Sequence, residues 1–250
     1  MPGLTAINEF EHWYQGPIGR ALLAAERVAL RQALDQCHGM VQVNVWISHR
    51  LPVATEAMLP YRCDLVPVWA EGMPDSAVVA RYTEWPVANE CVDVLVLHHS
   101  LDFSESPHQT LREAQRVLRP GGQLFVVGFN PWSTWGMRKL LSRGRKGPWA
   151  GHFISPGRLK DWLCLLDFEL TEKAHHFFLP PLGSFSWLSK LAFLDRIGPR
   201  LRLPTGAFYL LQAIKRVPGV MPLRPQWKKR TLAGSSVVPQ VVPFKPNEDC

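Results

Sequence analysis

The stretch from Val92 to Asn130 reads VDVLVLHHSLDFSESPHQTLREAQRVLRPGGQLFVVGFN and predicts one complete strand, helix, strand unit. Residues 92–97 and 123–129 are almost entirely apolar, which is typical of parallel strands covered on both faces of a sheet. Parallel neighbours cannot be joined by a tight turn, so residues 98–122 are expected to hold a crossover helix. The stretch therefore predicts an α/β protein with a largely parallel sheet.

The crossover helix has start and stop signals of its own. Ser106 is suited to the N-cap, Pro107 to the first helical position, and Gln109 to closing a capping box. The apolar residues at helical spacing form the face expected to be buried: Leu111, Ala114, Val117 and Leu118. The R-P-G-G sequence at 119–122 is expected to end the helix.

Two motifs in and beyond this stretch resemble class I S-adenosylmethionine-dependent methyltransferases. The first is L-R-x-x-x-R-x-L-x-P-G-G at residues 111–122, which joins the helix to the following strand. The second is G-F-N-P-W-S at 128–133, followed by W-G-M-R-K at 135–139. Together they narrow the resemblance to small bacterial type 11 methyltransferase-like proteins of unassigned substrate, related to the methyltransferases of quinone biosynthesis. The resemblance extends over about residues 20–216.

The resemblance implies a Rossmann-like sheet that is mostly parallel with an antiparallel last strand, and helices on both faces. It also implies S-adenosylmethionine as the cofactor and methyl transfer to an acceptor as the activity. No motif in the chain identifies that acceptor.

Hydrophobic periodicity predicts the remaining elements. A helix over residues 18–37 is expected to pack on the sheet from the N-terminal side. The expected strands are 41–48, 64–70, 78–82, 168–174 and 208–215, and the further expected helices are 135–142, 155–166 and 185–197. Ser155 is suited to cap the helix at 155–166, with Pro156 at its first position.

The 250 residues can form one methyltransferase-like domain over residues 1–217, and no second domain is required. From residue 218 onward, prolines punctuate a basic stretch that has few periodic apolar positions. Residues 218–250 are therefore predicted to be a tail that is disordered or draped over the surface.

Composition excludes several classes of protein. No run of about 18 apolar residues could span a bilayer, and Met1–Gln15 lacks the basic and then apolar pattern of a signal segment. We therefore expect a cytoplasmic protein without a transmembrane segment. The five cysteines are scattered without a CxxC pair, which indicates neither zinc nor a disulfide framework. His175 and His176 have no carboxylate or cysteine at ligand spacing, so no metal site is predicted.

The expected cofactor half departs from the family pattern. In the family, the first strand ends in a glycine-rich loop that lets the backbone approach the methionine part of the cofactor. Here Trp46, Ile47 and Ser48 hold that place, and no glycine occurs between Met40 and Glu71. Trp46 and Ser48 are therefore cofactor-binding candidates in a pocket that is either remodelled or no longer binds the cofactor.

The acidic residues that the family uses for the ribose and the adenine are matched only in part. Glu71 lies near the position expected for the ribose hydroxyls, although a solvated loop glutamate would look the same. Arg81 stands where the adenine-contacting acid is expected, and a guanidinium cannot accept a hydrogen bond. Glu84 could replace that acid, and Trp85 could either stack on a purine or be a core aromatic.

His98 and His99 follow the strand at 92–97, and doubly wound sheets bind ligands at the carboxyl ends of their strands. The pair could include a general base, and His98 could also neighbour the cofactor. Alternatively, one histidine caps the loop and the other faces solvent. Asn130 ends the next strand on the same rim, where it could orient a substrate or form an Asn-Pro turn. His98, His99 and Asn130 are therefore the catalytic candidates.

Charge is unevenly distributed, with a formal net charge of +7 and a basic segment at residues 138–160 that contains no acidic side chain until Asp161. The positive charge of this segment is compatible with three kinds of partner: an acidic or phosphorylated small molecule, a nucleic acid or an anionic membrane surface. It could equally be a solubilising surface.

Three functions follow from these observations. The leading hypothesis is an S-adenosylmethionine-dependent methyltransferase that acts on a small acidic or apolar acceptor. The second is a non-catalytic binding or scaffold protein on the same fold, with a degenerate cofactor site. A nucleic-acid-associated protein is the third, supported only by the basic charge and by no recognisable nucleic-acid motif.

Overall fold

The computed structural model describes residues 4–51, 53, 59–141, 146–181 and 204–216, with the side chains of residues 4–6 excepted. The chain divides into two compact units, Met1–Pro218 and Gly219–Cys250, and every described residue belongs to the first. The predicted helix at 185–197 and the predicted tail at 218–250 lie outside the described residues.

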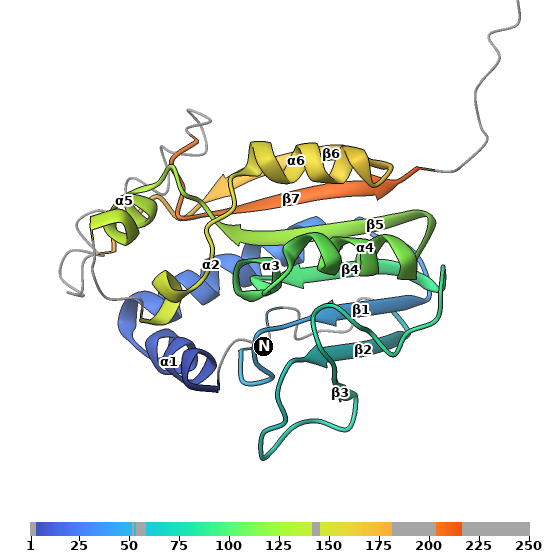
Figure 1. Cartoon of the computed structure of the whole chain (residues 1–250), viewed down its shortest axis with the longest axis horizontal. Coiled ribbons are helices and arrows are strands. Elements are labelled where there is room, and N and C mark those ends of the chain that lie inside the picture. Colours follow the sequence, from blue (N-terminus) through green and yellow to red (C-terminus); the bar gives the residue numbers. More distant parts are fainter. Residues whose placement is uncertain (1–3, 52, 54–58, 142–145, 182–203, 217–250) are drawn as a thin grey trace, which may run out of the picture. The chain divides into compact units, whose positions relative to one another are not determined.

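The first unit is built on a seven-stranded sheet in the order β3-β2-β1-β4-β5-β7-β6 (Figure 1). The strands are β1 Val41–Val45, β2 Tyr61–Val66, β3 Ala77–Val79, β4 Val92–His98, β5 Leu118–Phe129, β6 Phe168–His176 and β7 Phe208–Lys215. β7 runs antiparallel to β5 and β6, and the other neighbouring pairs are parallel. The prediction of a mostly parallel sheet with an antiparallel last strand is confirmed.

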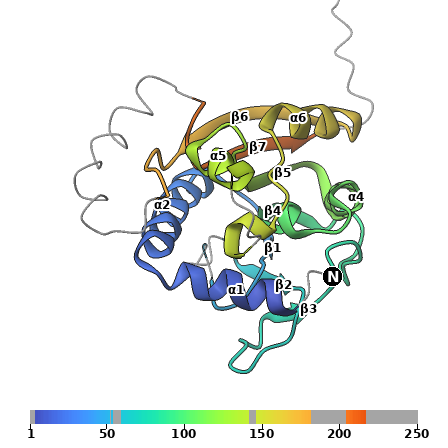
Figure 2. The same ribbon diagram turned by 60° about the vertical axis from the view of Figure 1, so that its left-hand side comes forward.

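Helices cover both faces of this sheet (Figures 1 and 2). They are α1 Leu4–Tyr14, α2 Pro17–Leu34, α3 Ser100–Phe103, α4 Pro107–Val117, α5 Thr134–Leu141 and α6 Pro156–Leu165, with a short 3-10 helix, η1, at Gly147–Ala150. In the view of Figure 1, α2 lies behind the sheet, whereas α3, α4 and α6 lie in front of it. Among the helices described, none has both the length and the apolar character needed to cross a membrane.

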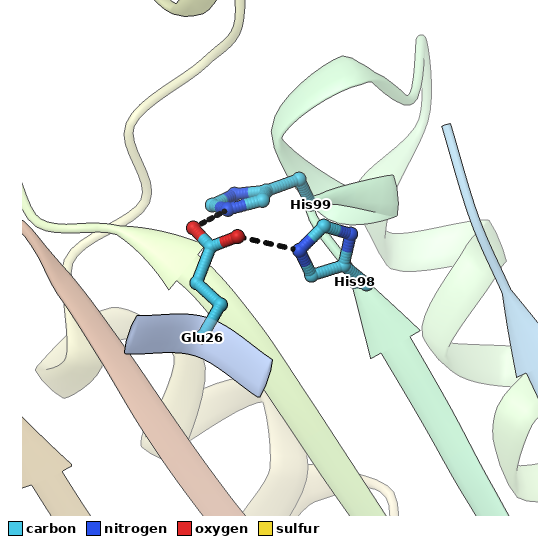
Figure 3. A group of neighbouring side chains, drawn as sticks. All are labelled: Glu26, His98 and His99. Carbon is cyan, nitrogen blue, oxygen red and sulfur yellow. Dashed lines mark hydrogen bonds and ion pairs between the residues drawn. The ribbon is translucent and has the colours of Figure 1, made fainter. Parts of the chain in front are cut away.

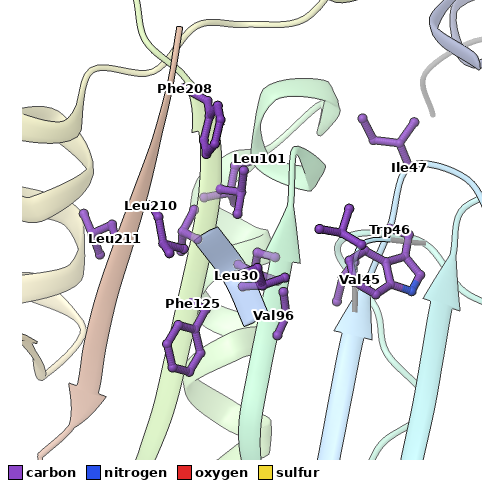
Figure 4. Packing of buried hydrophobic residues seen from close by; sticks show 14 of the residues in the cluster. Leu30, Val45, Trp46, Ile47, Val96, Leu101, Phe125, Phe208, Leu210 and Leu211 are labelled. Carbon is purple, nitrogen blue, oxygen red and sulfur yellow. The ribbon is translucent and has the colours of Figure 1, made fainter. Parts of the chain in front are cut away.

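The core lies between the central strands and the helices that cover them. All seven residues of β4 are buried, as expected for a central parallel strand between two helical layers. Leu30 of α2 packs beside Val96 of β4, close to Phe125 of β5 and Leu210 of β7 (Figure 4). Burial of one such side chain is worth about 1.5–3 kcal/mol, so this layer contributes strongly to holding α2 on the sheet.

The crossover unit confirms the predicted helix but not its cap. Leu111, Ala114 and Val117 of α4 are fully buried, as predicted. The Ser106 side chain makes no capping hydrogen bond, so the predicted capping box is wrong. Instead, Ser104 Oγ accepts from the backbone N–H of Ser106 at 3.2 Å and pairs with Thr110 Oγ1 at 2.8 Å. At α6, the predicted cap is confirmed, because the side chain of Ser155 accepts from the backbone of the third helical residue.

Several predicted boundaries differ from the structure. The R-P-G-G sequence at 119–122 does not follow the helix as a separate turn but lies inside β5, where Val92 pairs with Leu118 and Val94 pairs with Gln123. β2 begins at Tyr61, so Asp64 lies in the interior of the strand and not at its start. The helix α1 was not predicted at all, although its buried side chains, including Ile7, Phe10 and Tyr14, have helical spacing.

Candidate functional site

The order in which the chain adds strands to the sheet reverses between β1 and β4. The residues at and just after the carboxyl ends of these two strands lie side by side. β2 and β3 lie on one side of this pair and β5 to β7 on the other, which makes it the topological switch point where such sheets bind ligands. His98 ends β4, and its ring lies 5.7 Å from the ring of Trp46, which follows β1. The next residue, His99, has a left-handed backbone conformation with φ 51°, which is unusual for a residue with a side chain.

A buried glutamate on α2 joins the two histidines (Figure 3). Glu26 Oε2 lies 3.0 Å from His98 Nε2, and Glu26 Oε1 lies 3.0 Å from His99 Nε2. Tyr14, on α1, donates its hydroxyl proton toward the same carboxylate, at 3.1 Å from Oε1 and 3.3 Å from Oε2. All four side chains are buried, and the groups that hold the carboxylate come from α1 and from the end of β4.

A second carboxylate completes the cluster on the other side of His99. Asp102 Oδ2 lies 2.8 Å from His99 Nδ1 and accepts the backbone N–H of Phe129 at 3.0 Å. The Phe129 ring stacks on the imidazole of His99, with 4.0 Å between the ring centres. We refer to Glu26, His98, His99 and Asp102 as the switch-point cluster.

Burial and mutual charge set the protonation of this cluster. Burial alone would raise the pKa of Glu26, but the charge of His99 and hydrogen bonds from both imidazoles lower it to about 2. Burial would lower the pKa of His99, but Glu26 and Asp102 raise it to about 9. The pKa of His98 is lowered, mainly because the ring is buried. At neutral pH, His99 is therefore the protonated member and His98 the neutral one.

α1 encloses the switch-point cluster from the carboxyl ends of the strands. Phe10 is fully buried, and its ring centre lies 4.8 Å from that of Phe103 and 6.2 Å from that of His99. Ser48, after β1, donates its hydroxyl proton to Glu11 of α1. The hydroxyl of Ser48 is therefore bound to protein, and the aromatic side chains of α1 separate the cluster from solvent.

The place of the glycine-rich loop is filled by side chains. Trp46 is 1% exposed and Ile47 is 2% exposed, and both follow Val45 at the end of β1 (Figure 4). Tyr82 donates its hydroxyl proton to the backbone carbonyl of Trp46 at 3.4 Å. The close backbone approach that glycine would permit is replaced by a packed apolar corner.

A cavity of about 300 Å³ lies beside this corner. It is lined by Trp46, His49, Arg62, Asp64, Pro74, Ser76 and Ala77. The indole Nε1 of Trp46 is buried and has no hydrogen-bond partner, which is costly unless a ligand or water supplies one. Asp64 Oδ1 accepts from Asn44 Nδ2 at 2.7 Å, and Arg62 donates to both of its oxygens, at 3.0 and 2.7 Å. Asp64 was not among the predicted site residues.

The other predicted cofactor residues do not line this cavity. Glu71 is exposed in the turn after β2, and Glu84 is exposed beside Arg81, to which it is bridged through the backbone. Trp85 is 5% exposed, and Glu113 accepts its backbone N–H at 3.0 Å. This burial favours the reading of Trp85 as a core aromatic.

Asn130 forms a turn. Its Nδ2 donates to the carbonyls of Pro204 and Gly206, at 2.7 and 2.9 Å. Its Oδ1 accepts the backbone N–H of Trp132 at 3.1 Å, and its side chain is fully buried. The amide is therefore bound to backbone on both sides, which favours the turn role over contact with a substrate.

Sequence reasoning found the two histidines of the cluster but missed their partners. Glu26 lies on the apolar face of α2, one turn from Leu22 and from Leu30, and a charged residue on an apolar helix face was a signal that the sequence reasoning did not use. Asp102 lies in the short helix α3, for which the sequence reasoning predicted no element. Within the described residues, Glu26, His98 and His99 form the group of three side chains whose donor atoms all lie within 4.8 Å of one another. His175 and His176 belong to no such group there.

Part of the chain matches a known protein family. Residues 61–126, from β2 into β5, match a family model described as a methyltransferase domain. The predicted resemblance to class I methyltransferases is confirmed. This match supports S-adenosylmethionine as the cofactor.

The chain is also similar to two proteins that are described as uncharacterized. The chain is 42% identical over 116 residues to the uncharacterized protein YafS of Escherichia coli, in an alignment that covers 46% of this chain and 48% of YafS. It is 28% identical over 203 residues to the uncharacterized protein Rv2003c of Mycobacterium tuberculosis, covering 72% of this chain and 66% of that protein. The chain thus spans about half the length of the first relative and 66% of the second.

A solved structure has the same fold. It is an S-adenosylmethionine-dependent methyltransferase from Thermotoga maritima, described as a possible histamine N-methyltransferase. The TM-score is 0.62 at 18% identity, and the match covers 84% of this chain and 96% of that one. At this identity the likeness concerns the fold alone.

Proposed function

We propose that the protein is an S-adenosylmethionine-dependent methyltransferase that acts on a small-molecule acceptor. The observation that carries this proposal is the methyltransferase match over β2 to β5, which contains the strand end where the switch-point cluster lies. A small acidic or apolar acceptor remains part of the proposal, as does a cytoplasmic location.

The cavity beside β2 is the place we propose for the adenosine part of the cofactor. Its volume of about 300 Å³ is at the lower end of the range for ligand pockets. Asp64 lines the cavity and offers carboxylate oxygens to ribose hydroxyls, and the Trp46 side chain forms part of the cavity wall. This assignment moves the ribose carboxylate from Glu71 to Asp64, while Trp46 keeps its predicted role.

The chemistry of the transfer is a displacement at the methyl carbon. Bound S-adenosylmethionine would supply an electrophilic methyl group on a sulfonium, which would become a neutral thioether when the acceptor atom takes the methyl. A proton that the acceptor loses must pass to a base, and positioning supplies much of the rate. His98 is the neutral imidazole of the switch-point cluster, so its charge state fits the base better than that of His99.

A non-catalytic binding protein on the same fold is the second candidate. The observation that favours it is the packed corner at Trp46 and Ile47, together with the enclosure of the switch-point cluster by α1. A ligand that approached these strand ends would have to displace side chains that are buried in this state.

Two charges of the basic segment at 138–160, those of Arg138 and Lys139, are engaged by the protein itself. The guanidinium of Arg138 lies over the Trp149 ring at 4.4 Å, and the ammonium of Lys139 lies over the Phe153 ring at 4.4 Å. Both side chains also donate to backbone carbonyls, those of Pro181 and Gly151. These charges stabilise the fold, and we do not include a nucleic acid or an anionic surface in the proposal.

Calorimetric titration of the full chain with S-adenosylmethionine and S-adenosylhomocysteine tests the proposal. We expect binding with a dissociation constant weaker than about 1 μM, because the glycine loop is replaced by buried side chains. Asp64→Asn should weaken binding at least about tenfold, a loss of roughly 1.4 kcal/mol, whereas Glu71→Ala should bind like the parent. Absence of binding to the folded parent contradicts the methyltransferase function. The opposite ranking of the two variants contradicts only the placement at Asp64.

Transfer from methyl-labelled S-adenosylmethionine to a small-molecule extract separates the two candidate functions. Labelled product that depends on the parent chain supports the enzyme. The same extracts are first shown to give labelled product with a known methyltransferase. If the chain binds the cofactor but gives no labelled product from them, the result favours the binding protein.

A further inference from the structure

We propose that Glu26, His98 and His99 bind one divalent transition-metal ion of the zinc type, and that Asp102 orients His99 toward it. The three donor groups come from α2 and from the end of β4, far apart in the sequence, and their donor atoms lie within 4.8 Å of one another. Figure 3 shows each imidazole directing Nε2 at a different oxygen of Glu26. This inference does not depend on methyl transfer, and it is an alternative to the base role proposed for His98, because an imidazole bound to a metal through Nε2 carries its proton on Nδ1 and has no nitrogen left to accept one.

The hydrogen-bond pattern around His99 requires one more proton, or one more cation, than a neutral imidazole between two carboxylates supplies. Nδ1 faces Asp102 at 2.8 Å and Nε2 faces Glu26 at 3.0 Å, so both ring nitrogens point at carboxylate oxygens. A neutral imidazole carries only one N–H and would direct a lone pair at one of these oxygens. Either a second proton, on the ring or on one of the carboxyls, or a metal ion must therefore lie beside His99.

Charge balance favours the metal ion over the proton. Glu26 and Asp102 place two carboxylates in a site where each is at most 1% exposed, and unbalanced buried charge is costly. A proton on His99 balances one carboxylate. A divalent ion that takes the place of that proton balances both.

The geometry suits this ion. Zinc binds imidazole nitrogen and carboxylate oxygen at about 2.0–2.2 Å, which in a tetrahedron places neighbouring donors about 3.4 Å apart. The two measured imidazole–carboxylate separations are 3.0 Å each, so small side-chain shifts open the site. A carboxylate on the far nitrogen of a ligating histidine, as Asp102 is on His99, is the usual outer support of such sites.

The donor set also indicates the class of metal. Two imidazoles and one carboxylate favour zinc, iron, cobalt or nickel over magnesium and calcium, which prefer oxygen. Three protein ligands leave a fourth position open, next to the Tyr14 hydroxyl that lies 3.1 Å from Glu26 Oε1. Because α1 encloses the cluster, we expect the ion to enter as the chain folds and to exchange slowly afterwards.

Refolding with a spectroscopic metal tests the proposal. The full chain is unfolded in denaturant with EDTA and refolded either in EDTA or with Co²⁺ or Zn²⁺. We expect about one equivalent of Co²⁺ to remain after desalting, with the visible absorption of tetrahedral cobalt, and the metal-loaded chain to unfold at a higher temperature than the EDTA sample. Absence of a thiolate-to-cobalt band in the near ultraviolet separates this site from the cysteines. A refolded chain, native by circular dichroism, that retains no metal overturns the proposal.

Matched variants locate the ion. Asp102→Asn should weaken cobalt binding by about 10–100-fold, and Glu26→Gln, which keeps the shape but not the charge, should weaken it further. The double variant His175→Gln and His176→Gln changes an adjacent histidine pair outside the cluster and should bind like the parent. If Glu26→Gln does not fold, Asp102→Asn still decides. Unchanged binding in Asp102→Asn, or loss in the control pair, overturns the assignment.

Discussion

Tyr14 shows how a single side chain supports the buried charge of this protein. The residue is 1% exposed, and its hydroxyl lies within 3.3 Å of both oxygens of Glu26. Burial and the neighbouring carboxylate raise the pKa of Tyr14 well above its ordinary value, so the phenol keeps its proton and donates it. A buried carboxylate needs such donors, because water cannot reach it.

Tyr14→Phe should therefore lower the free energy of unfolding by about 1.5–3 kcal/mol, the usual range for a hydrogen bond to a charged group. Urea denaturation at neutral pH measures it. Tyr61→Phe is the matched control, since Tyr61 is 64% exposed, and its effect should stay within about 0.5 kcal/mol. Equal stability of the two variants would contradict the role of Tyr14.

Glu113 of α4 links the loop after β3 to the helix. It accepts from Arg116 Nε at 2.9 Å and from the backbone N–H of Trp85 at 3.0 Å. The hydrogen bonds from Arg116 are the main cause that holds the pKa of Glu113 below its ordinary value of 4.5. A carboxyl with a lowered pKa stabilises the fold fully above its ordinary pKa, and this contribution is lost as the pH falls through the lower value.

Glu113→Gln should therefore reduce the loss of stability that the parent shows between about pH 5 and pH 3. Chemical denaturation at several pH values measures this slope. The control Glu71→Gln changes an exposed turn residue and should keep the slope of the parent. A parent-like slope in Glu113→Gln would refute the assignment.

At the residue scale, the sequence analysis identified the two histidines that follow a strand, but it did not identify the glutamate that tertiary packing places beside them. His98 and His99 were found because they follow an apolar strand at the edge where ligands bind. Glu26 lies on a helix more than 70 positions earlier in the chain, with sequence separations of 72 and 73. Such pairing depends on how α2 crosses β4, and no local pattern encodes that crossing.

Among the elements, α5 shows how the N-P-W-S motif works. Ser133 Oγ donates to the carbonyl of Asn130 at 2.7 Å and accepts the backbone N–H of Gly136 at 3.2 Å, which caps the helix. A β-carbon at Gly136 would lie 1.9 Å from the carbonyl oxygen of Pro131. The N-P-W-S motif therefore forms a compact turn, and this turn requires a glycine at position 136 of the following helix.

Gly136→Ala should destabilise the fold by about 1–3 kcal/mol or more, because the backbone must move to admit the methyl group. Gly157→Ala is the matched helical control. A β-carbon there meets nothing within 4 Å, so the alanine should leave stability unchanged or raise it by up to about 1 kcal/mol. Thermal unfolding of both variants measures the difference, and two equal effects would contradict the close approach at Gly136.

Element types were predictable wherever the apolar pattern was strong, and boundaries less so. β7 was predicted at its observed bounds, Phe208–Lys215, because its residues are mostly apolar, with Gln212 as the interior exception. β2 was placed too late, since its first residues, Tyr61 and Arg62, do not show the apolar signal of a buried strand. α1 was missed because the N-terminal residues were considered only as a signal segment.

At the scale of the whole molecule, the two compact units predict where the chain can be shortened. A chain that ends at Pro218 keeps every described element, from α1 to β7. Its melting temperature should match that of the full chain within about 2 °C, which is less than about 1 kcal/mol for a domain of this size. Differential scanning calorimetry measures both. A larger drop would mean that residues 219–250 stabilise the first unit.

The position of β7 in the sheet has a consequence for synthesis of the protein. β7 is the last of the described strands to leave the ribosome, yet it lies between β5 and β6, and β6 pairs with no other strand of the described sheet. Until residue 215 has emerged, β5 of the nascent chain has an unpaired edge, and β6 has no strand to pair with. Unpaired strand edges of this kind can pair with other chains and so cause aggregation. Premature termination before β7 should therefore yield aggregates that occupy chaperones, and no partially active fragment.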